Sequence, residues 1–249
     1  MASYKVEAVV LKTYDLGEAD KILVLFTREA GKVSAVAKGS RKPRSKSAGG
    51  AQVFGHNVYL LHRGRNLDIV GQYEIVRQYR QIRGDLDSLA YASYAADLVF
   101  QTSHERDPAP DVFDLLIWIL NTIEEERNPE VAFHVFELRL METLGYRPQL
   151  DACVVCGREV PAIARFSSEA GGILCDRCRQ GAAGAREISE GALRSLRLLQ
   201  ESRDTRWQSL GLAGEVLREV RAVLDDYIVY RLEKRPASLE FLRSLKQSK

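Results

Sequence analysis

Two stretches decide the fold of the N-terminal part of this chain: Tyr4-Lys-Val-Glu-Ala-Val-Val-Leu-Lys-Thr-Tyr14 and Lys21-Ile-Leu-Val-Leu-Phe-Thr27. Both runs are rich in β-branched and aromatic residues, and Gly17 and Gly31 mark the turns that follow them. The next run, Lys32-Val-Ser-Ala-Val-Ala-Lys38, has the period of two that is typical of a half-buried strand. The chain is therefore expected to begin with three consecutive strands.

Two further strands are predicted over residues 53–62 and 67–76, with a hairpin turn at Arg63-Gly-Arg-Asn66 between them. Five short strands within about 75 residues fit a small closed barrel. The OB-fold is the commonest such barrel in nucleic-acid binders, and an SH3-like barrel fits the pattern nearly as well. The sequence predicts an OB-fold domain over residues 1–80.

From about residue 83 the apolar residues follow a helical period. The run from Val112 to Leu120 is apolar on nearly every side, so it is expected at the centre of a helical bundle. The predicted helices cover 85–103, a segment capped by Asp111, a segment from Asn128-Pro129 to Gly145, a segment from Ser189, 212–234 and 239–245. Residues 81–249 are therefore assigned to a helical domain, which makes the chain an α+β protein.

Positive charge is concentrated near the N-terminus. Residues 1–80 carry 14 Lys or Arg against 7 Asp or Glu, whereas the rest of the chain carries 22 against 27. No acidic residue lies between Glu29 and Asp68, and residues 39–51 have the Pro and Gly content of a mobile surface loop. Such a run usually meets a polyanion, although a solvated loop that aids solubility is an open alternative. The candidate DNA-binding residues are Lys38, Arg41, Lys42, Arg44, Lys46, Arg63 and Arg65.

All four cysteines fall in one segment, as Cys153-Val-Val-Cys156 and Cys175-Asp-Arg-Cys178, with 18 residues between the pairs. Two C-x-x-C turns at this separation can place four thiolates around one tetrahedral ion. One structural Zn²⁺ is expected, because four protein ligands leave no position for a reacting water. Two disulfides, a redox pair and an iron–sulfur cluster are the alternatives. A zinc ribbon is thus predicted as an insert at about residues 150–182, with a short hairpin near residues 166–174.

The sequence contains no recognised catalytic motif. It has no phosphate-binding loop, no G-x-G-x-x-G and none of the histidine motifs of metalloproteases or deaminases. The adjacent carboxylates at Glu124–Glu126 and at Asp225-Asp226 diverge around their helices, so they are expected on solvated faces. No apolar run is long enough to span a membrane, and the N-terminus lacks the apolar centre of a signal peptide. A cytoplasmic protein that is not an enzyme is expected.

Motifs along nearly the whole chain resemble those of the RecO family of bacterial recombination mediator proteins. In the predicted barrel these are Glu7–Lys12, Gly17–Asp20, Phe26–Lys32, Ala37–Gly39, the basic tract that ends at Lys46, and Phe54. In the second half they are Phe136–Tyr146, Pro148, Leu150 and Cys153–Gly157. The order of these motifs is more specific than any one of them. With all four cysteines present, the chain looks like the zinc-bearing type of the family.

The resemblance implies a function that needs neither a nucleotide nor a catalytic residue. Family members bind single- and double-stranded DNA and anneal complementary strands. With a RecR partner they load RecA recombinase onto DNA coated by single-strand-binding protein, and they contact the C-terminal tail of that coating protein. A bacterial protein that is cytoplasmic, and associated with the nucleoid during repair, is implied.

From the residues themselves, we expect a cationic loop that holds two strands by their phosphates until the strands pair. Aromatic residues of the barrel are candidates for stacking on bases, although half or more are expected in the core: Tyr14, Phe54, Tyr59 and Tyr73. One alternative is a generic OB-fold or zinc-ribbon module that binds RNA or DNA. The enzymatic alternative, a zinc-dependent nuclease, is disfavoured because four thiolates fill the metal's coordination sphere.

Overall fold

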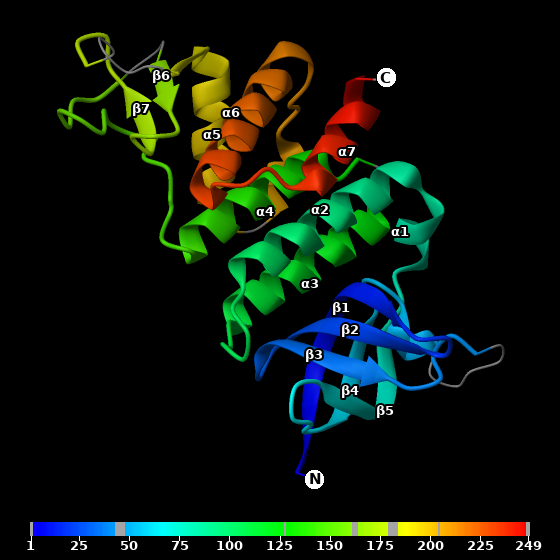
Figure 1. The fold of residues 1–249 in the computed structure, drawn as a ribbon. Coiled ribbons are helices and arrows are strands. Elements are labelled where there is room, and N and C mark those ends of the chain that lie inside the picture. The colour runs from blue at the N-terminus through cyan, green and yellow to red at the C-terminus, as the bar shows by residue number, and fades with distance from the viewer. Residues whose placement is uncertain are drawn as a thin grey trace. The chain divides into compact units, whose positions relative to one another are not determined.

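A computed structural model describes residues 2–42, 48–126, 128–160, 164–178, 184–203 and 205–247. The chain forms two compact units, Met1–Arg127 with Ala237–Lys249, and Asn128–Pro236. In Figure 1 the first unit contains the barrel with helices, and the second contains helices with a small sheet. The boundary predicted near residue 80 marks the end of the barrel and lies inside the first unit. No helix in the described part of the chain is both long and apolar enough to cross a membrane.

The barrel consists of five strands: β1 (Ser3–Leu16), β2 (Asp20–Thr27), β3 (Gly31–Ala37), β4 (His56–His62) and β5 (Asp68–Arg77). They close in the order β1-β2-β3-β5-β4, and β4 pairs back with β1 (Figure 1). All neighbours are antiparallel except β3 and β5, which are parallel. This is the Greek-key order of the OB-fold rather than that of an SH3-like barrel. The predicted class, a five-stranded barrel followed by helices that carry a four-cysteine insert, is confirmed.

A β-bulge at Leu11 decides which side chains of β1 face the barrel interior. The register against β2 shifts between Val10 and Lys12, so Val10 lies in the core while Lys12 faces outward. Without the extra residue, the period of two would direct Lys12 into the core. Instead its ammonium lies 2.9 Å from Asp97 and 3.9 Å from the ring centre of Phe100, both on α2 (Leu86–Thr102). The bulge therefore converts a lysine into a tie between barrel and helix.

Helices α1 (Arg80–Gly84), α2, α3 (Pro110–Glu125) and α7 (Ala237–Gln247) complete the first unit. The Phe26 ring on the outer face of β2 lies 6.2 Å from Phe113 of α3. The prediction that Asp111 caps α3 is wrong, because Ala109 is the N-cap residue and Pro110 opens the helix. Asp111 lies in the first turn, where a carboxylate interacts favourably with the helix dipole.

At the end of α3, Glu125 and Glu126 are exposed as expected, whereas Glu124 is partly buried and departs from the expectation of a solvated face. The carboxylate of Glu124 accepts hydrogen bonds from the backbone N–H groups of Gln81, at 3.1 Å, and Ile82, at 3.0 Å. These groups belong to the first turn of α1, where backbone donors have no partner within the helix. Glu125 pairs with Arg77 at 2.8 Å. Glu124 thus joins α3 to the first turn of α1, and Glu125 joins α3 to the end of β5.

The carboxylate of Asp68 links three segments around the end of the β4–β5 turn. It is fully buried and accepts hydrogen bonds from the Tyr4 hydroxyl, the Gly64 N–H and the Arg106 guanidinium. Burial alone would raise its pKa, but these hydrogen bonds and the charge of Arg106 outweigh burial and leave the pKa of Asp68 below its usual value. The charged form of Asp68 is therefore the one that stabilises the barrel.

The second unit contains α4 (Glu130–Thr143), α5 (Glu190–Glu201), a 3₁₀ turn at Thr205–Ser209 and α6 (Gly214–Leu232). Ser189 caps α5 as predicted, since its hydroxyl accepts a hydrogen bond from the N–H of Ala192. The predicted start of α4 is wrong by one residue, because Pro129 is the N-cap residue rather than the first helical residue. Gly145, with φ +81°, follows the end of α4.

Ionisable side chains are buried between α4 and α6. Arg221 of α6 pairs with Glu130 of α4, and His134 Nδ1 lies 2.7 Å from the Glu137 carboxylate. Burial raises the pKa of Glu137, although His134 opposes that shift. Asp225 of α6 is also buried, so the prediction of a solvated face at this position is wrong. The Arg221–Glu130 pair joins α6 to α4, and removing one member would leave the charge of the other without its partner.

We predict that Asp68→Asn lowers the free energy of unfolding by about 2 kcal/mol at pH 7, because Arg106 loses a charged partner. Since the folded-state pKa of Asp68 is lowered, its contribution is present above about pH 4 and is lost as the pH falls through the folded-state value. Urea unfolding at pH 7 and pH 3 should show the difference between variant and wild type shrinking at the lower pH. Glu74→Gln, an exposed carboxylate on the same strand, is the control. A difference that is constant with pH would contradict the role of the charge.

Candidate metal centre and nucleic-acid interface

Four cysteine sulfurs converge in the second unit. The Sγ atoms of Cys153, Cys156, Cys175 and Cys178 all lie within 4.8 Å of one another, and those of Cys156 and Cys175 are 3.7 Å apart. A tetrahedron with metal–sulfur bonds of ~2.3 Å has edges of about 3.8 Å. The four side chains could therefore hold one metal ion, as their spacing in the sequence predicts.

Each C-x-x-C pair forms a tight turn. The carbonyl of Cys153 accepts a hydrogen bond from the N–H of Gly157, and the carbonyl of Cys175 accepts one from Cys178. Gly157 has φ +68°, which a residue with a side chain adopts only with strain. The sheet beside the turns has the order β7-β6-β8, formed by β6 (Ala164–Ser167), β7 (Gly172–Leu174) and β8 (Arg186–Ile188). Strand β8 was not predicted, because three residues are too few to show a period.

The electrostatics of this cluster favour a cation. Burial disfavours the Cys153 thiolate, but backbone N–H groups directed at its sulfur outweigh that effect and lower its pKa to about 6. The pKa of Cys178 rises to about 12, because its thiol hydrogen-bonds to Cys156 and lies near the other sulfurs. Four thiolates so close together repel one another unless a positive ion lies between them. The donor set therefore fits a metal that prefers sulfur ligands.

The basic tract of the first unit begins in a turn that is held against the β1–β2 hairpin. The N–H of Gly39 donates to the Asp20 carboxylate at 2.7 Å. The Arg41 guanidinium donates to the carbonyl of Gly17 at 2.6 Å and lies 3.2 Å from the Asp15 carboxylate. Arg41 is thus a tether with a partly neutralised charge. The neighbouring Lys38 and Lys42 are exposed and make no ion pair with any residue that the structure describes.

The other end of the tract is anchored in the short 3₁₀ helix η1 (Gly49–Ala51). The Tyr59 hydroxyl donates to the carbonyl of Gly50 at 2.6 Å, and Gly50 lies so close to the Tyr73 ring that a Cβ atom would be 2.7 Å from it. Gly50 and Ala51 are buried. The prediction of a mobile loop up to residue 51 is therefore wrong at this end, because tyrosines from β4 and β5 fix the backbone.

The remaining candidate DNA-binding residues fall into two groups. Arg44 and Lys46 lie outside the described residues. Arg63 and Arg65 follow β4, whose His62 pairs with Ser3 at the beginning of β1. Lys38 follows β3, whose Ala37 pairs with Lys21, the partner of Asp15 near the end of β1. The register thus places the β4–β5 turn, which carries Arg63 and Arg65, at the opposite end of the barrel from the turn after β3, which carries Lys38, Arg41 and Lys42. Figure 1 shows these two turns on opposite sides of the barrel.

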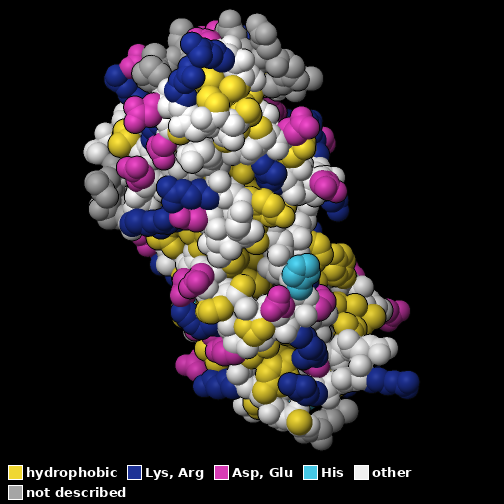
Figure 2. Space-filling model, turned by 90° about the vertical axis from the view of Figure 1, so that its left-hand side faces the viewer, with side chains coloured by type: hydrophobic (Ala, Val, Ile, Leu, Met, Phe, Trp, Pro, Cys, Tyr) yellow, Lys and Arg dark blue, Asp and Glu magenta, His cyan; other side chains and the backbone are white. Residues whose placement is uncertain are grey.

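The four aromatic residues that were candidates for stacking on bases differ in their burial. Tyr59 and Phe54 are buried, and burial raises the pKa of Tyr59 far above its usual value. Tyr73 is half-buried beneath Gly50, whereas the Tyr14 side chain is exposed. On the face drawn in Figure 2, Lys and Arg side chains are interspersed with Asp and Glu. A binding surface has to be identified there from individual unpaired cations rather than from net charge.

Comparison with known proteins places this chain in a family. The model described as Recombination protein O N terminal matches residues 1–79, and the one described as Recombination protein O C terminal matches residues 83–240. The chain belongs to the RecO family. The resemblance inferred from the sequence motifs is confirmed, and the N-terminal match of the RecO family ends where the barrel ends.

Relatives named DNA repair protein RecO are similar along their whole length. The relative from Symbiobacterium thermophilum is 41% identical, and the match covers 100% of both chains. The relative from Desulforamulus reducens is 36% identical, with 100% of this chain and 97% of the relative covered. The relative from Acetivibrio thermocellus is 33% identical over 98% of each chain. The likeness to RecO relatives therefore includes the barrel, the helices and the cysteine segment.

We predict that Cys175→Ser lowers the metal content of the purified protein and the unfolding free energy of the second unit by about 3 kcal/mol or more, because a structural metal contributes folding energy directly. Metal analysis and thermal unfolding would check both effects. Val155→Ser changes an exposed residue inside the first turn and is the matched control. Unchanged stability in Cys175→Ser, with no metal bound, would contradict a structural role for the ion.

We predict that Gly50→Ala weakens DNA binding about 3-fold or more, a loss of at least ~0.7 kcal/mol, although it removes no charge. The added Cβ would overlap the Tyr73 ring and displace the anchor of the basic tract. Fluorescence anisotropy with a single-stranded oligonucleotide would measure the change. Gly84→Ala, where nothing lies within 4 Å of the added atom, is the control. Equal affinity in both variants would show that the anchor does not position the cations.

Proposed function

We propose that this chain is a non-enzymatic mediator of recombinational DNA repair. It binds single- and double-stranded DNA, anneals complementary strands and, with a RecR partner, helps to load RecA recombinase onto DNA coated by single-strand-binding protein. One observation carries the proposal: a RecO-family OB-fold barrel holds both ends of its basic tract and leaves Lys38 and Lys42 exposed and unpaired among the residues that the structure describes. The name of the relatives, DNA repair protein RecO, supports the same process.

The proposed mechanism is charge neutralisation without base recognition. Lys38 and Lys42 contact phosphates, Arg44 and Lys46 extend this contact, and Arg41 holds the turn in place. Lysine and arginine contacts to phosphates carry no sequence information, so any two complementary strands can be bound. Two strands that repel each other in solution meet on one cationic surface, where pairing becomes favourable. Three to five phosphate contacts give a slope of about −2 to −3.5 in a plot of log affinity against log salt.

The metal of the cysteine cluster is proposed to be one structural Zn²⁺. Cys153, Cys156, Cys175 and Cys178 would hold it, and the ion would cross-link the two turns of the ribbon. Four thiolates complete a tetrahedral sphere, which supports a role in folding rather than in catalysis. The RecR partner and the C-terminal tail of single-strand-binding protein are proposed as protein partners on the strength of family membership.

The test is the annealing rate of two labelled complementary DNA oligonucleotides without ATP. We predict that changing Lys38, Arg41, Lys42, Arg44 and Lys46 together to Gln reduces annealing at least 10-fold, and makes the salt slope shallower by about 0.7 for each phosphate that the variant no longer neutralises. The matched control is Arg63→Gln with Arg65→Gln, because these cations lie at the other end of the barrel. We expect the control to anneal nearly as fast as wild type.

The other outcomes separate this proposal from its rivals. Annealing that survives the five changes would place the DNA site away from the basic tract. Tight binding without annealing by the wild type would indicate a generic OB-fold binding module. Strand cleavage that stops on metal chelation would indicate a nuclease.

A further inference from the structure

A cluster of three tyrosines surrounds one arginine beside the cysteine ribbon. The Arg231 guanidinium, on the last turn of α6, lies 5.0 Å from the ring centre of Tyr227, 5.5 Å from that of Tyr230 and 5.7 Å from that of Tyr146. Its Nη2 atom approaches Gly171, in the turn between β6 and β7, so closely that a Cβ there would be 2.6 Å away. The end of α6, the segment after α4 and the ribbon hairpin therefore meet at Arg231.

The buried and exposed members of the cluster have different environments. Tyr227 is buried, donates its hydroxyl to the carbonyl of Tyr146 at 2.7 Å and packs edge-on against Phe166. Tyr146 and Tyr230 are instead 45% and 46% exposed. Each of these two rings lies against Arg231, and about half of each residue stays open to solvent. Exposure of about half is what a ring shows when one face is covered and the other is open.

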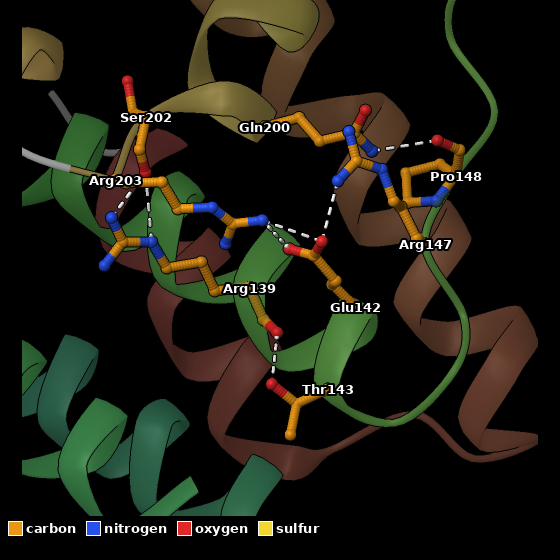
Figure 3. Close-up of polar contacts among 8 residues, drawn as sticks. All are labelled: Arg139, Glu142, Thr143, Arg147, Pro148, Gln200, Ser202 and Arg203. Carbon is orange, nitrogen blue, oxygen red and sulfur yellow. Dashed lines mark hydrogen bonds and ion pairs between the residues drawn. The ribbon is translucent and has the colours of Figure 1, made fainter. Parts of the chain in front are cut away.

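Unpaired positive charge accompanies the two exposed rings. Arg231 makes no ion pair with any described residue, and the exposed Lys234 and Arg235 follow it without a described partner. Glu233 is the one acidic residue in this stretch. Arg147, which follows Tyr146, is different, because it pairs with Glu142 at 2.7 Å, as Arg203 also does (Figure 3). Beside the partly buried Arg231, the end of α6 therefore carries two exposed cations, Lys234 and Arg235, without an acidic partner among the described residues.

We propose that Tyr146, Tyr230, Arg231, Lys234 and Arg235 form a second binding surface for single-stranded DNA, here called the tyrosine–arginine surface. The inference rests on the proposed function and adds to it a second site in the second unit. Unpaired bases stack on aromatic rings with little sequence preference, and a guanidinium adds a cation–π contribution. Lys234 and Arg235 would contact the adjacent phosphates. A duplex has its bases stacked already, so this surface should prefer single strands.

The surface gives one chain two separate places for DNA. The basic tract contacts phosphates and takes single or double strands, whereas the tyrosine–arginine surface requires free base faces. Annealing brings together two unpaired strands and releases a duplex. A surface that binds unpaired bases and loses them on pairing would release the product while the basic tract retains its hold on the phosphates.

The experiment compares two oligonucleotides of equal length and charge, one of thymidines and one of abasic residues. They are titrated against the full chain with all five basic-tract residues changed to Gln, so that binding by the tract does not mask the second site. Tyr146→Ala with Tyr230→Ala should weaken thymidine binding about 5-fold or more and leave abasic binding unchanged. Tyr230→Phe keeps the ring and should retain affinity. Phe241→Ala, an exposed aromatic residue on α7, is the control.

Photocrosslinking with 5-iodouracil DNA, followed by mass spectrometry, supplies an independent readout. A crosslink on Tyr230 or Tyr146 supports the surface, whereas equal affinities for both oligonucleotides and no crosslink would overturn it. Binding of an acidic aromatic peptide that the tyrosine changes abolish, with thymidine binding intact, would overturn it in favour of a protein partner. If one of these results overturns the tyrosine–arginine surface while wild-type annealing still depends on the basic tract, this inference fails and the proposed function stands. If the wild type neither binds nor anneals DNA, the proposed function fails.

Discussion

The barrel closes through its shortest strand pairing. β3 and β5 pair only at Ala35 with Asp68 and at Val36 with Ile69. This pairing is held from the side by Asp68, which draws the start of β1, the β4–β5 turn and the connection between α2 and α3 to one buried carboxylate. Beyond Ile69, η1 rather than a strand packs on Tyr73 of β5. The short closure thus creates the place where the basic tract returns to the barrel.

The two units stabilise their functional segments by different physical means. In the first unit an extended sheet supplies carbonyls, carboxylates and tyrosine rings that grip the ends of a loop. In the second unit the ribbon strands are only three or four residues long, too short to bury a core of their own. There the four cysteines supply the constraint, and the stacked Arg231 holds the ribbon hairpin to α6. A metal among the sulfurs would replace the hydrophobic burial that so small a sheet lacks.

The sequence was sufficient for the features that depend on local pattern. The barrel strands, the cap at Ser189 and the four-cysteine cluster follow from period, cap chemistry and spacing, and all three are present. Features that depend on distant partners were missed. Nothing near Glu124 in the sequence indicates that it accepts hydrogen bonds from Gln81 and Ile82, or near Asp225 that it is buried against α4. The adjacent Gly49 and Gly50 do indicate that another group comes close to the backbone there. The sequence does not show which group it is, because the ring belongs to Tyr73 on β5, more than 20 residues away.

The same limit explains why counting basic residues overstates the DNA-binding surface. Between Glu29 and Asp68 every charged residue is a Lys or Arg. Not all of these cations are free, because the ammonium of Lys32 donates to the carbonyls of Phe100 and Ser103 at the end of α2. Arg41 is engaged with Asp15, and Arg63 lies over the ring of Tyr4. Cations that are already engaged within the fold neutralise few phosphates and so release few of the counterions bound to the DNA, which means that they add little to salt-dependent affinity. The cations free to meet phosphates are those that the fold leaves unpaired, and their number, rather than the net charge, sets the salt dependence of binding.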